Sequence, residues 1–331
     1  MRLLVTGGAG YIGSHCVTAL LKAGHHVTVV DNLSTGFHES LEKARQQGVD
    51  FFKEDIRNIA AIKQIMQQQK IEGILHFAAK LIVPESVAVP LDYYDNNVIG
   101  SLRLIQACQE LGIKYFIFSS TASVYGNGSN RSAKENDATN TINPYGASKR
   151  MVEQILQDYA LASPEFKFIA LRYFNVAGAA LEGDNGQRTK GATHLIKVAC
   201  EVATGQRPNL QVFGNDWGTP DKTCVRDYIH VQDLVEAHVD ALSALKKGHS
   251  GGIFNCGYGK GYSVLEVIDM VAKVSGKKIA TMAAPRRAGD PELLVSNSQR
   301  IREELDWVPQ FDSLELICRS AYEWECKRIK L

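Results

Sequence analysis

The sequence has 331 residues, about twice the size of a typical domain, so we expect one large domain or two unequal ones. With 45% hydrophobic and 22% charged residues and a formal net charge of +1, it is typical of a globular protein and argues against nucleic acid or a membrane surface as partner. The chain begins directly with a strand pattern and has no apolar run long enough to cross a bilayer, so we expect no signal peptide. Its seven cysteines are scattered and form no C-x-x-C pairs, which favours a reduced, cytoplasmic protein. Its nine histidines show no metal-ligand spacing, so we expect no metal site.

Residues 2–31 have the pattern of a strand, a tight turn, a helix and a second strand. Glycines stand at Gly7, Gly10 and Gly13, directly after the first apolar run. Glycine lets the chain turn sharply and lets backbone N–H groups approach an anion without a Cβ in the way. A helix that begins near Tyr11 would point the positive end of its dipole at that anion. This stretch predicts a site for the phosphates of a dinucleotide.

The second apolar run, residues 27–30, ends at Asp31. An acidic residue at this point can accept hydrogen bonds from an adenosine ribose, and it would repel a 2′-phosphate. The sequence therefore predicts NAD rather than NADP as the cofactor.

The first half of the chain continues to alternate between strand and helix patterns. Helices are expected over residues 91–111 and from Pro144 onward, and further strands over residues 50–52, 73–77, 114–118 and 167–171. The strand at 114–118 is almost continuously apolar, which is typical of a strand covered by helices on both faces. Together these elements predict an α/β protein with a doubly wound parallel sheet, a Rossmann fold.

Beyond residue 175 the pattern changes, and residues 178–191 show no regular periodicity. We expect an NAD-binding domain over residues 1–175 and a smaller C-terminal α/β substrate domain over 176–331, with parts of 225–245 packing back on the first domain. The expected elements of the second domain are short strands at 211–213, 252–255 and 278–282, and helices at 231–245, 264–274 and 314–327.

The residues that predict chemistry are Tyr145 and Lys149. Asn143 and Pro144 are typical of a helix start, so Tyr145 and Lys149 are expected on one face of the first helical turns. A lysine ammonium beside the phenol, together with a positive nicotinamide ring, is expected to lower the pKa of Tyr145 and make it a usable base. A hydroxyl at the end of the preceding strand, that of Thr121, is expected to share a proton with Tyr145 at a substrate oxygen.

These motifs carry a family resemblance. The TGGAGYIG turn, the SSTASVYG strand end and the Tyr145/Lys149 pair resemble the extended short-chain dehydrogenase/reductase family. Within it, the chain is similar over essentially its full length to the UDP-glucose 4-epimerases, through HFAA, YYDNNV, NPYGASK, LRYFNVAGA, VRDYIHVQDL and APRRAGDP.

The resemblance implies a bound NAD, a homodimer, and the interconversion of UDP-glucose and UDP-galactose in galactose metabolism. In such a reaction Tyr145, held by Lys149 and Thr121, takes the proton from the sugar 4-hydroxyl while C4 gives hydride to the nicotinamide. The 4-keto sugar then turns while its diphosphate stays anchored, and it takes hydride back on the opposite face. By resemblance the homodimer would form through the helices at 91–111 and 144–161.

The same resemblance implies two further sets of site residues. Besides the three glycines, the residues that would touch NAD are Tyr11, Ile12, Asp31, Asn32, Asp55, Ile56, Phe77, Ala78, Ala79, Asn96, Tyr145, Lys149 and Phe174. Those that would surround the UDP-sugar, besides Thr121 and Tyr145, are Tyr173, Asn175, Leu195, Phe213, Arg226, Arg287 and Asp290. The two arginines suit a diphosphate because a guanidinium offers a planar fork of donors.

Three alternatives stay open at this point: a 4-epimerase of another UDP-sugar, a nucleotide-sugar dehydratase, and a non-catalytic NAD-sensing protein. A dehydratase usually has an Asp-Glu pair after the strand-end threonine, where this chain has Ala122-Ser123, and a sensor would lack the Tyr/Lys pair. Leu81 and His194 stand where some relatives have lysine and asparagine. Leu294 stands where relatives restricted to unmodified hexoses often have tyrosine, which favours some activity on N-acetylated UDP-sugars.

Overall fold

The computed structural model describes residues 1–127, 132–287 and 289–330. The chain forms two compact units, and it passes between them more than once. The first unit holds Met1–Val124, Thr141–Arg172 and Val235–Phe254. The second holds Tyr125–Asn140, Tyr173–Leu234 and Asn255–Leu331.

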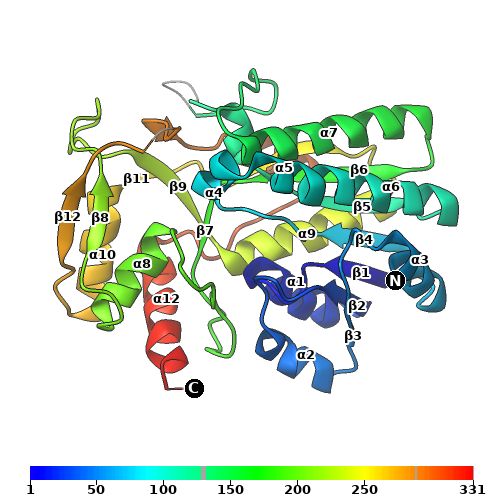
Figure 1. Cartoon of the computed structure of the whole chain (residues 1–331), viewed down its shortest axis with the longest axis horizontal. Coiled ribbons are helices and arrows are strands. Elements are labelled where there is room, and N and C mark those ends of the chain that lie inside the picture. Colours follow the sequence, from blue (N-terminus) through cyan, green and yellow to red (C-terminus); the bar gives the residue numbers. More distant parts are fainter. Residues whose placement is uncertain (128–131, 288, 331) are drawn as a thin grey trace. The chain divides into compact units, whose positions relative to one another are not determined.

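The first unit is built on a seven-stranded sheet in the order β10-β6-β5-β4-β1-β2-β3 (Figure 1). Its strands are β1 (Arg2–Thr6), β2 (His26–Asp31), β3 (Asp50–Lys53), β4 (Gly73–His76), β5 (Tyr115–Thr121), β6 (Lys167–Tyr173) and β10 (Gly252–Cys256). The pairings that link β3, β2, β1, β4 and β5 are all parallel. The order runs outward in both directions from β1, which confirms the doubly wound α/β fold expected from the sequence.

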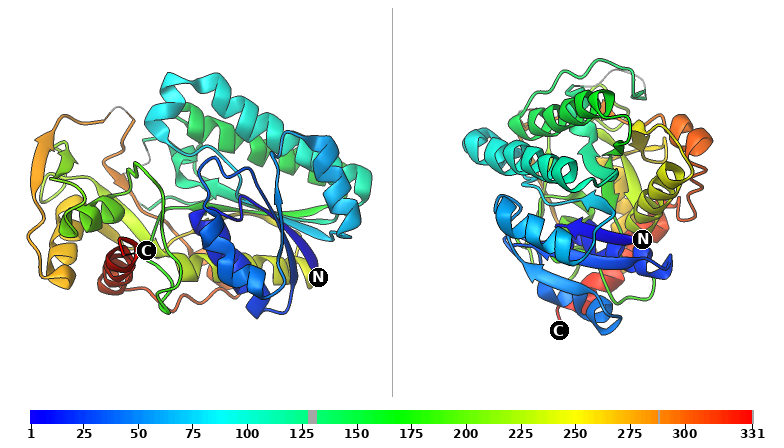
Figure 2. Two further views of the ribbon diagram at one scale, coloured as in Figure 1. Left: turned by 60° about the horizontal axis from the view of Figure 1, so that its bottom comes forward. Right: turned by 90° about the vertical axis from the view of Figure 1, so that its right-hand side faces the viewer.

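Helices flank this sheet, and most of them turn an apolar stripe toward it. They are α1 (Tyr11–Lys22), α2 (Glu42–Gln46), α3 (Ile59–Gln68), α6 (Gly100–Leu111), α7 (Pro144–Ala162) and α9 (Val231–Lys246). On one face, Ile62 of α3, Leu104 of α6 and Leu156 of α7 join Ile74 and Phe116 of the strands in one buried cluster. Figure 2 shows α6 and α7 lying side by side over that face. Each such side chain contributes roughly 1.5–3 kcal/mol through the area it buries.

The helix predicted at residues 91–111 is interrupted in the structure. It follows α4 (Val83–Ala88) and consists of α5 (Pro90–Tyr93), a π-helical turn η2 (Tyr94–Ile99) and α6. It ends where Gly112 takes the left-handed conformation, with φ of 66°. A π-helical turn of this kind is often found at functional sites.

The second unit contains a small sheet centred on β9 (Val225–His230). This strand pairs antiparallel with β11 (Gly261–Ser263) and parallel with β13 (Leu293–Leu294) and β7 (Asn175–Ala177). Two further strands, β8 (Leu210–Phe213) and β12 (Thr281–Ala284), pair parallel with each other. The helices of this unit are α8 (Leu195–Ala203), α10 (Val264–Ser275), α11 (Gln299–Glu304) and α12 (Leu314–Arg328), and α8, α10 and α12 pack together.

One predicted strand lies in a different place from the one expected. The strand at 252–255 was assigned to the second domain, but β10 is the edge strand of the seven-stranded sheet, next to β6. The buried side chains of Ile253 and Phe254 explain why the sheet takes it up. Gly251 makes this possible, because a Cβ at that position would lie 2.2 Å from the carbonyl oxygen of Phe168.

Candidate active site

The turn after β1 leaves no room for side chains. Gly7 has a φ of 70°, and a Cβ on it would lie 2.5 Å from the backbone nitrogen of Ala78. A Cβ on Gly13 would lie 2.2 Å from the carbonyl oxygen of Gly7. Gly10 is the N-cap of α1, and no side chain among the described residues caps that helix. Tyr11 and Ile12 lie in the first turn of α1, where the positive end of the helix dipole suits an anionic ligand.

Asp31 ends β2 beside this turn. Its carboxylate accepts hydrogen bonds from the backbone N–H of Ala9, at 2.9 Å, and from that of Leu33, at 2.8 Å. Burial raises the pKa of Asp31, and the two backbone donors oppose the shift. The fixed carboxylate keeps free lone pairs for further donors, as a ribose diol would require.

The next predicted cofactor residues follow β2, β3 and β4. Asn32 donates a hydrogen bond of 3.0 Å to Asp55, and the side-chain bonds from Arg57 hold the pKa of Asp55 well below its usual range. Ile56 is buried after β3, and Phe77, Ala78 and Ala79 follow β4. Because these strands are parallel, their carboxyl ends meet at one edge of the sheet, where dinucleotides bind in doubly wound folds.

Asn97, a neighbour of the predicted Asn96 in η2, was not predicted from the sequence. Its amide donates to the carbonyl of Lys80 at 3.0 Å and to the hydroxyl of Ser148 at 3.0 Å. Its oxygen accepts from the backbone of Lys80 at 2.8 Å and from Asn96 at 2.9 Å. Asn97 thus joins the segment after β4 to α7, and a second asparagine beside Asn96 was the only signal for it in the sequence.

Tyr145 lies in the first turn of α7, beside the end of β5. Asn143 caps the helix through a 2.8 Å bond from the backbone N–H of Gly146. A Cβ on Gly146 would lie 2.7 Å from the carbonyl oxygen of Ser123, so only glycine allows α7 this close to the strand end. As a result Thr121, the last residue of β5, lies beside Tyr145, and its hydroxyl acts to lower the pKa of the phenol. The structure therefore brings the predicted tyrosine and threonine together.

Lys149 is buried one turn further along α7. Its ammonium donates a 2.7 Å hydrogen bond to the carbonyl of Ser119 and lies 4.8 Å from the centre of the Phe118 ring. Burial lowers the pKa of Lys149 to about 7, while the charge of Glu153 acts in the opposite direction.

The expected lowering of the pKa of Tyr145 does not occur in the protein alone. Burial raises that pKa, and the hydroxyl of Thr121 only partly offsets the rise. Lys149 is not among the causes of this shift, and its ammonium donates to the carbonyl of Ser119. Ionisation of Tyr145 in this site therefore calls for a further positive charge.

A buried ion pair that was not predicted anchors α7. Glu153 accepts hydrogen bonds from Arg172 of β6, at 2.9 and 2.8 Å, and from the hydroxyl of Ser120, at 2.6 Å. Breaking such a buried pair typically costs about 3–5 kcal/mol, because one charge is left uncompensated. In the sequence, Tyr145, Lys149 and Glu153 are spaced by four residues, which places them on one helix face. This spacing was the signal from which a role for Glu153 could have been predicted.

The predicted substrate residues lie mostly in the second unit. Tyr173 ends β6, Phe174 follows it, and the amide of Asn175 donates to the carbonyl of Asp227 at 3.2 Å. On β9, a guanidinium nitrogen of Arg226 lies 3.9 Å from a carboxylate oxygen of Asp290. These groups offer a cation and a carboxylate next to each other, as recognition of a diphosphate and a ribose requires.

Phe213 and Arg287 form a second pair in this unit. The guanidinium of Arg287 stands 3.7 Å from the centre of the Phe213 ring. A flat aromatic face and a forked cation are suited to a nucleobase and a phosphate.

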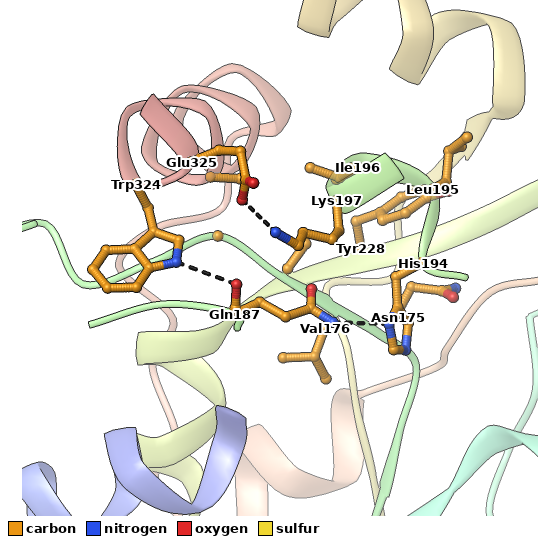
Figure 3. Close-up of a pocket in the computed structure, with 13 residues that line it drawn as sticks. Asn175, Val176, Gln187, His194, Leu195, Ile196, Lys197, Tyr228, Trp324 and Glu325 are labelled. Atoms are coloured by element: carbon orange, nitrogen blue, oxygen red, sulfur yellow. Dashed lines mark hydrogen bonds and ion pairs between the residues drawn. The ribbon is translucent and has the colours of Figure 1, made fainter. Parts of the chain in front are cut away.

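A pocket of the second unit includes the predicted Asn175 and Leu195 (Figure 3). Gln187 donates to Nδ1 of His194 at 2.9 Å, a direction that fixes the other imidazole nitrogen as a donor. Desolvation of the ring lowers the pKa of His194. His194 thus keeps a hydrogen-bond donor at the position where the resemblance places asparagine in some relatives.

None of the helices in the described part of the chain is long and apolar enough to cross a membrane. Among the same residues, no group of three or more His, Cys, Asp or Glu side chains is placed to hold a metal ion.

The class of the protein follows from these features together with a family comparison. A sequence model of the NAD dependent epimerase/dehydratase family matches residues 3–257. The chain belongs to this family, which confirms the resemblance to extended short-chain dehydrogenases/reductases.

Individual relatives narrow the comparison further. A UDP-glucose 4-epimerase from Azospirillum brasilense is 49% identical over 324 residues, covering 98% of this chain and 92% of the relative. The crystal structure of a UDP-glucose-4-epimerase from Stenotrophomonas maltophila, with bound NAD and formylated UDP-arabinopyranose, matches with a TM-score of 0.96 and 38% identity over 100% of this chain and 99% of that one. A UDP-Glc/GlcNAc 4-epimerase from Campylobacter jejuni matches with a TM-score of 0.86 and 47% identity over 98% and 99% of the two chains.

Proposed function

We propose that this protein is a UDP-glucose 4-epimerase that interconverts UDP-glucose and UDP-galactose with a tightly bound NAD. The observation that carries the proposal is the placement of Tyr145 beside Thr121, one turn from the buried Lys149. The chain also belongs to a family whose members include UDP-glucose 4-epimerases that are similar to it over nearly its full length.

The residues present fit NAD. The turn around Gly7 and Gly13 is a cradle that a Cβ would fill, and Asp31 offers a fixed carboxylate to an adenosine ribose. When bound, NAD supplies an acceptor for the hydride of sugar C4 and returns it. The nicotinamide also brings the positive charge that ionisation of Tyr145 calls for.

The side chains of the chain have distinct roles in this proposal. Tyr145 takes the proton of the 4-hydroxyl and gives it back, while Thr121 holds the phenol in place. Lys149 stays fixed by the Ser119 carbonyl, where its charge favours the phenolate. Arg226 and Arg287 hold the diphosphate, so that the sugar can turn without being released.

The direct test is to incubate the purified protein with UDP-glucose and no added NAD. We expect UDP-galactose to accumulate until the two sugars reach equilibrium. Formation of a dehydrated sugar would favour the dehydratase alternative, although the strand end continues with Ala122-Ser123. Absence of any product with a panel of UDP-sugars would contradict the proposal.

We expect NAD to co-purify with the protein, and Asp31→Ala to weaken its retention. The substitution removes the carboxylate that Ala9 and Leu33 hold in place, while the three glycines of the turn remain. Denaturing the purified variant and the wild type and measuring released NAD(H) per chain checks this. Release of NADP(H) from the wild type, or equal NAD(H) from both proteins, would contradict the role of Asp31.

Leu294 is proposed to set the breadth of sugar specificity. It lies on β13 and pairs in register with Arg226, a predicted diphosphate ligand. Leucine lacks the ring and hydroxyl of tyrosine, which leaves room for an N-acetyl group. We expect activity on UDP-GlcNAc as well as UDP-glucose, and Leu294→Tyr should lower the first relative to the second. If the ratio of kcat/KM for the two UDP-sugars is the same in the variant as in the wild type, Leu294 does not set the sugar specificity.

A homodimer in a reducing cytoplasm is part of this proposal. Helices α4 to α7 expose large apolar side chains, including Leu91 at 79% and Leu161 at 83%. All seven cysteines, each in the described part of the chain, are free thiols, as in a reducing compartment. Light scattering of the wild type should give twice the mass of one chain. Leu91→Arg should shift the measured mass toward that of one chain. The control Val308→Arg, at an exposed site of the second unit, should not change it. A wild type with the mass of one chain would contradict the dimer.

A further inference from the structure

Arg286 precedes the predicted diphosphate ligand Arg287 and has a different set of contacts. Its guanidinium donates to the Asp216 carboxylate at 2.7 Å and to the Asp216 carbonyl at 2.7 Å. The same guanidinium lies 4.0 Å from the centre of the Trp217 ring. One planar group therefore engages a side chain, a backbone oxygen and an aromatic face at the same time.

The segment that Arg286 holds begins at the ends of two paired strands. β8 and β12 are parallel and in register up to Phe213 and Ala284, so the chain leaves both strands at the same edge. The backbone N–H of Gly214 donates to the carbonyl of Ala284 at 2.9 Å, and the indole of Trp217 donates to the carbonyl of Phe213 at 3.2 Å. The loop after β8 is thus folded back on Phe213.

Gly214 shows how closely the parts of this loop approach each other. It has a φ of 79°, and a Cβ there would lie 2.4 Å from the indole nitrogen of Trp217 and 2.8 Å from Cγ of Arg286. Trp217 is buried in this arrangement, although it belongs to a loop. Trp217 is therefore packed in this contact, whereas the ion pair between Arg286 and Asp216 is exposed, at 43% and 67%, and contributes little by itself.

The two neighbouring arginines stack on two nearby aromatic rings, one in the loop after β8 and one at the end of β8. Arg286 lies over Trp217, and Arg287 stands 3.7 Å from the centre of the Phe213 ring. The second pair was predicted to bind the UDP part of the substrate. The position of Arg287 depends on the backbone beside it, and that backbone is fixed through Arg286.

We propose that Arg286 is a positioning residue: by clamping Asp216 and Trp217, it holds the segment that places the Arg287 guanidinium at Phe213 for recognition of a nucleoside diphosphate. This inference rests on the proposed function. Arg286 itself does not touch the ligand. Its contribution to binding acts through Arg287, which makes the two arginines energetically dependent on each other.

The test is to titrate UDP into the purified protein, which carries its own cofactor, and to measure the Kd by calorimetry. Arg286→Ala should raise the Kd for UDP about tenfold, a size typical of coupled neighbours. Arg286→Lys should raise it as well, because an ammonium keeps the charge but lacks the planar fork. In the Arg287→Ala background, Arg286→Ala should have less than about a twofold further effect, since the group it positions is gone.

The matched control is Arg300→Ala. Arg300 is exposed to a similar degree, 40% against 43% for Arg286, and it forms an ion pair with Glu304 on α11. This variant should bind UDP like the wild type. If Arg286→Ala unfolds, Asp216→Ala removes one partner of the clamp and should raise the Kd by a smaller factor.

An unchanged Kd in Arg286→Ala, full rescue by lysine, or additive effects of the two arginine substitutions would each overturn the positioning role. In those cases the wild type still binds UDP, and the proposed function stands. A wild type that does not bind UDP at all would overturn both.

Discussion

Tyr145→Phe is expected to reduce kcat for UDP-glucose epimerisation by at least the ~10²–10⁴ that acid–base catalysis typically contributes. The substitution removes the phenolic oxygen beside Thr121, while the ring and the cap by Asn143 remain. The variant should therefore still fold, and it should still retain NAD and bind UDP. Steady-state kinetics together with released NAD per chain gives both quantities.

The matched variant is Tyr159→Phe, which removes the same oxygen from the same helix. The Tyr159 ring packs against Phe166, with ring centroids 4.6 Å apart, away from the Thr121 end of β5. Its kcat should be close to that of the wild type. Near-normal turnover in Tyr145→Phe would show that the proton acceptor is another group.

Gly13→Ala is expected to strip the protein of NAD. The added Cβ would lie 2.2 Å from the carbonyl oxygen of Gly7, so α1 has to move away from the turn. Overpacking of this kind typically costs about 1–3 kcal/mol, which corresponds to about a fivefold to hundredfold loss of affinity when the strain falls on the binding site. Released NAD per chain, measured beside the thermal unfolding midpoint, checks the result.

Gly112→Ala separates loss of the cofactor from loss of stability. Gly112 ends α6 with a φ of 66°, and no described atom lies within 4 Å of a Cβ placed there. The strain of the left-handed backbone should lower stability by roughly 1–2 kcal/mol and leave NAD in place. If Gly13→Ala keeps as much NAD as Gly112→Ala, the glycine turn is not the phosphate cradle.

The sequence predicted the first unit well because its signals are local. The glycine spacing, the apolar strand at 114–118 and the Asn143-Pro144 helix start each depend on neighbouring residues, and each appears in the structure as β1–α1, β5 and α7. The edge strand β10 was misplaced because its partner β6 lies some 80 residues earlier in the chain, and no short-range pattern encodes that pairing.

Parts of the site could not be predicted for a similar reason. The ion pair between Glu153 and Arg172 joins a helix to a strand, and Asn97 joins the segment after β4 to α7. Burial, which raises the pKa of Tyr145, is a property of the folded site, whereas the spacing of Tyr145 and Lys149 indicates only that a cation is near.

The central claim is that C4 of the sugar is oxidised and reduced within one binding event. The most direct measurement uses UDP-glucose carrying deuterium at C4, in ordinary water, with mass spectrometry and NMR of the UDP-galactose formed. Hydride that leaves and returns does not exchange with solvent, so we expect the deuterium to remain at C4 of the product. Loss of the label to water would show that the stereocentre is inverted by proton abstraction, and it would contradict the account.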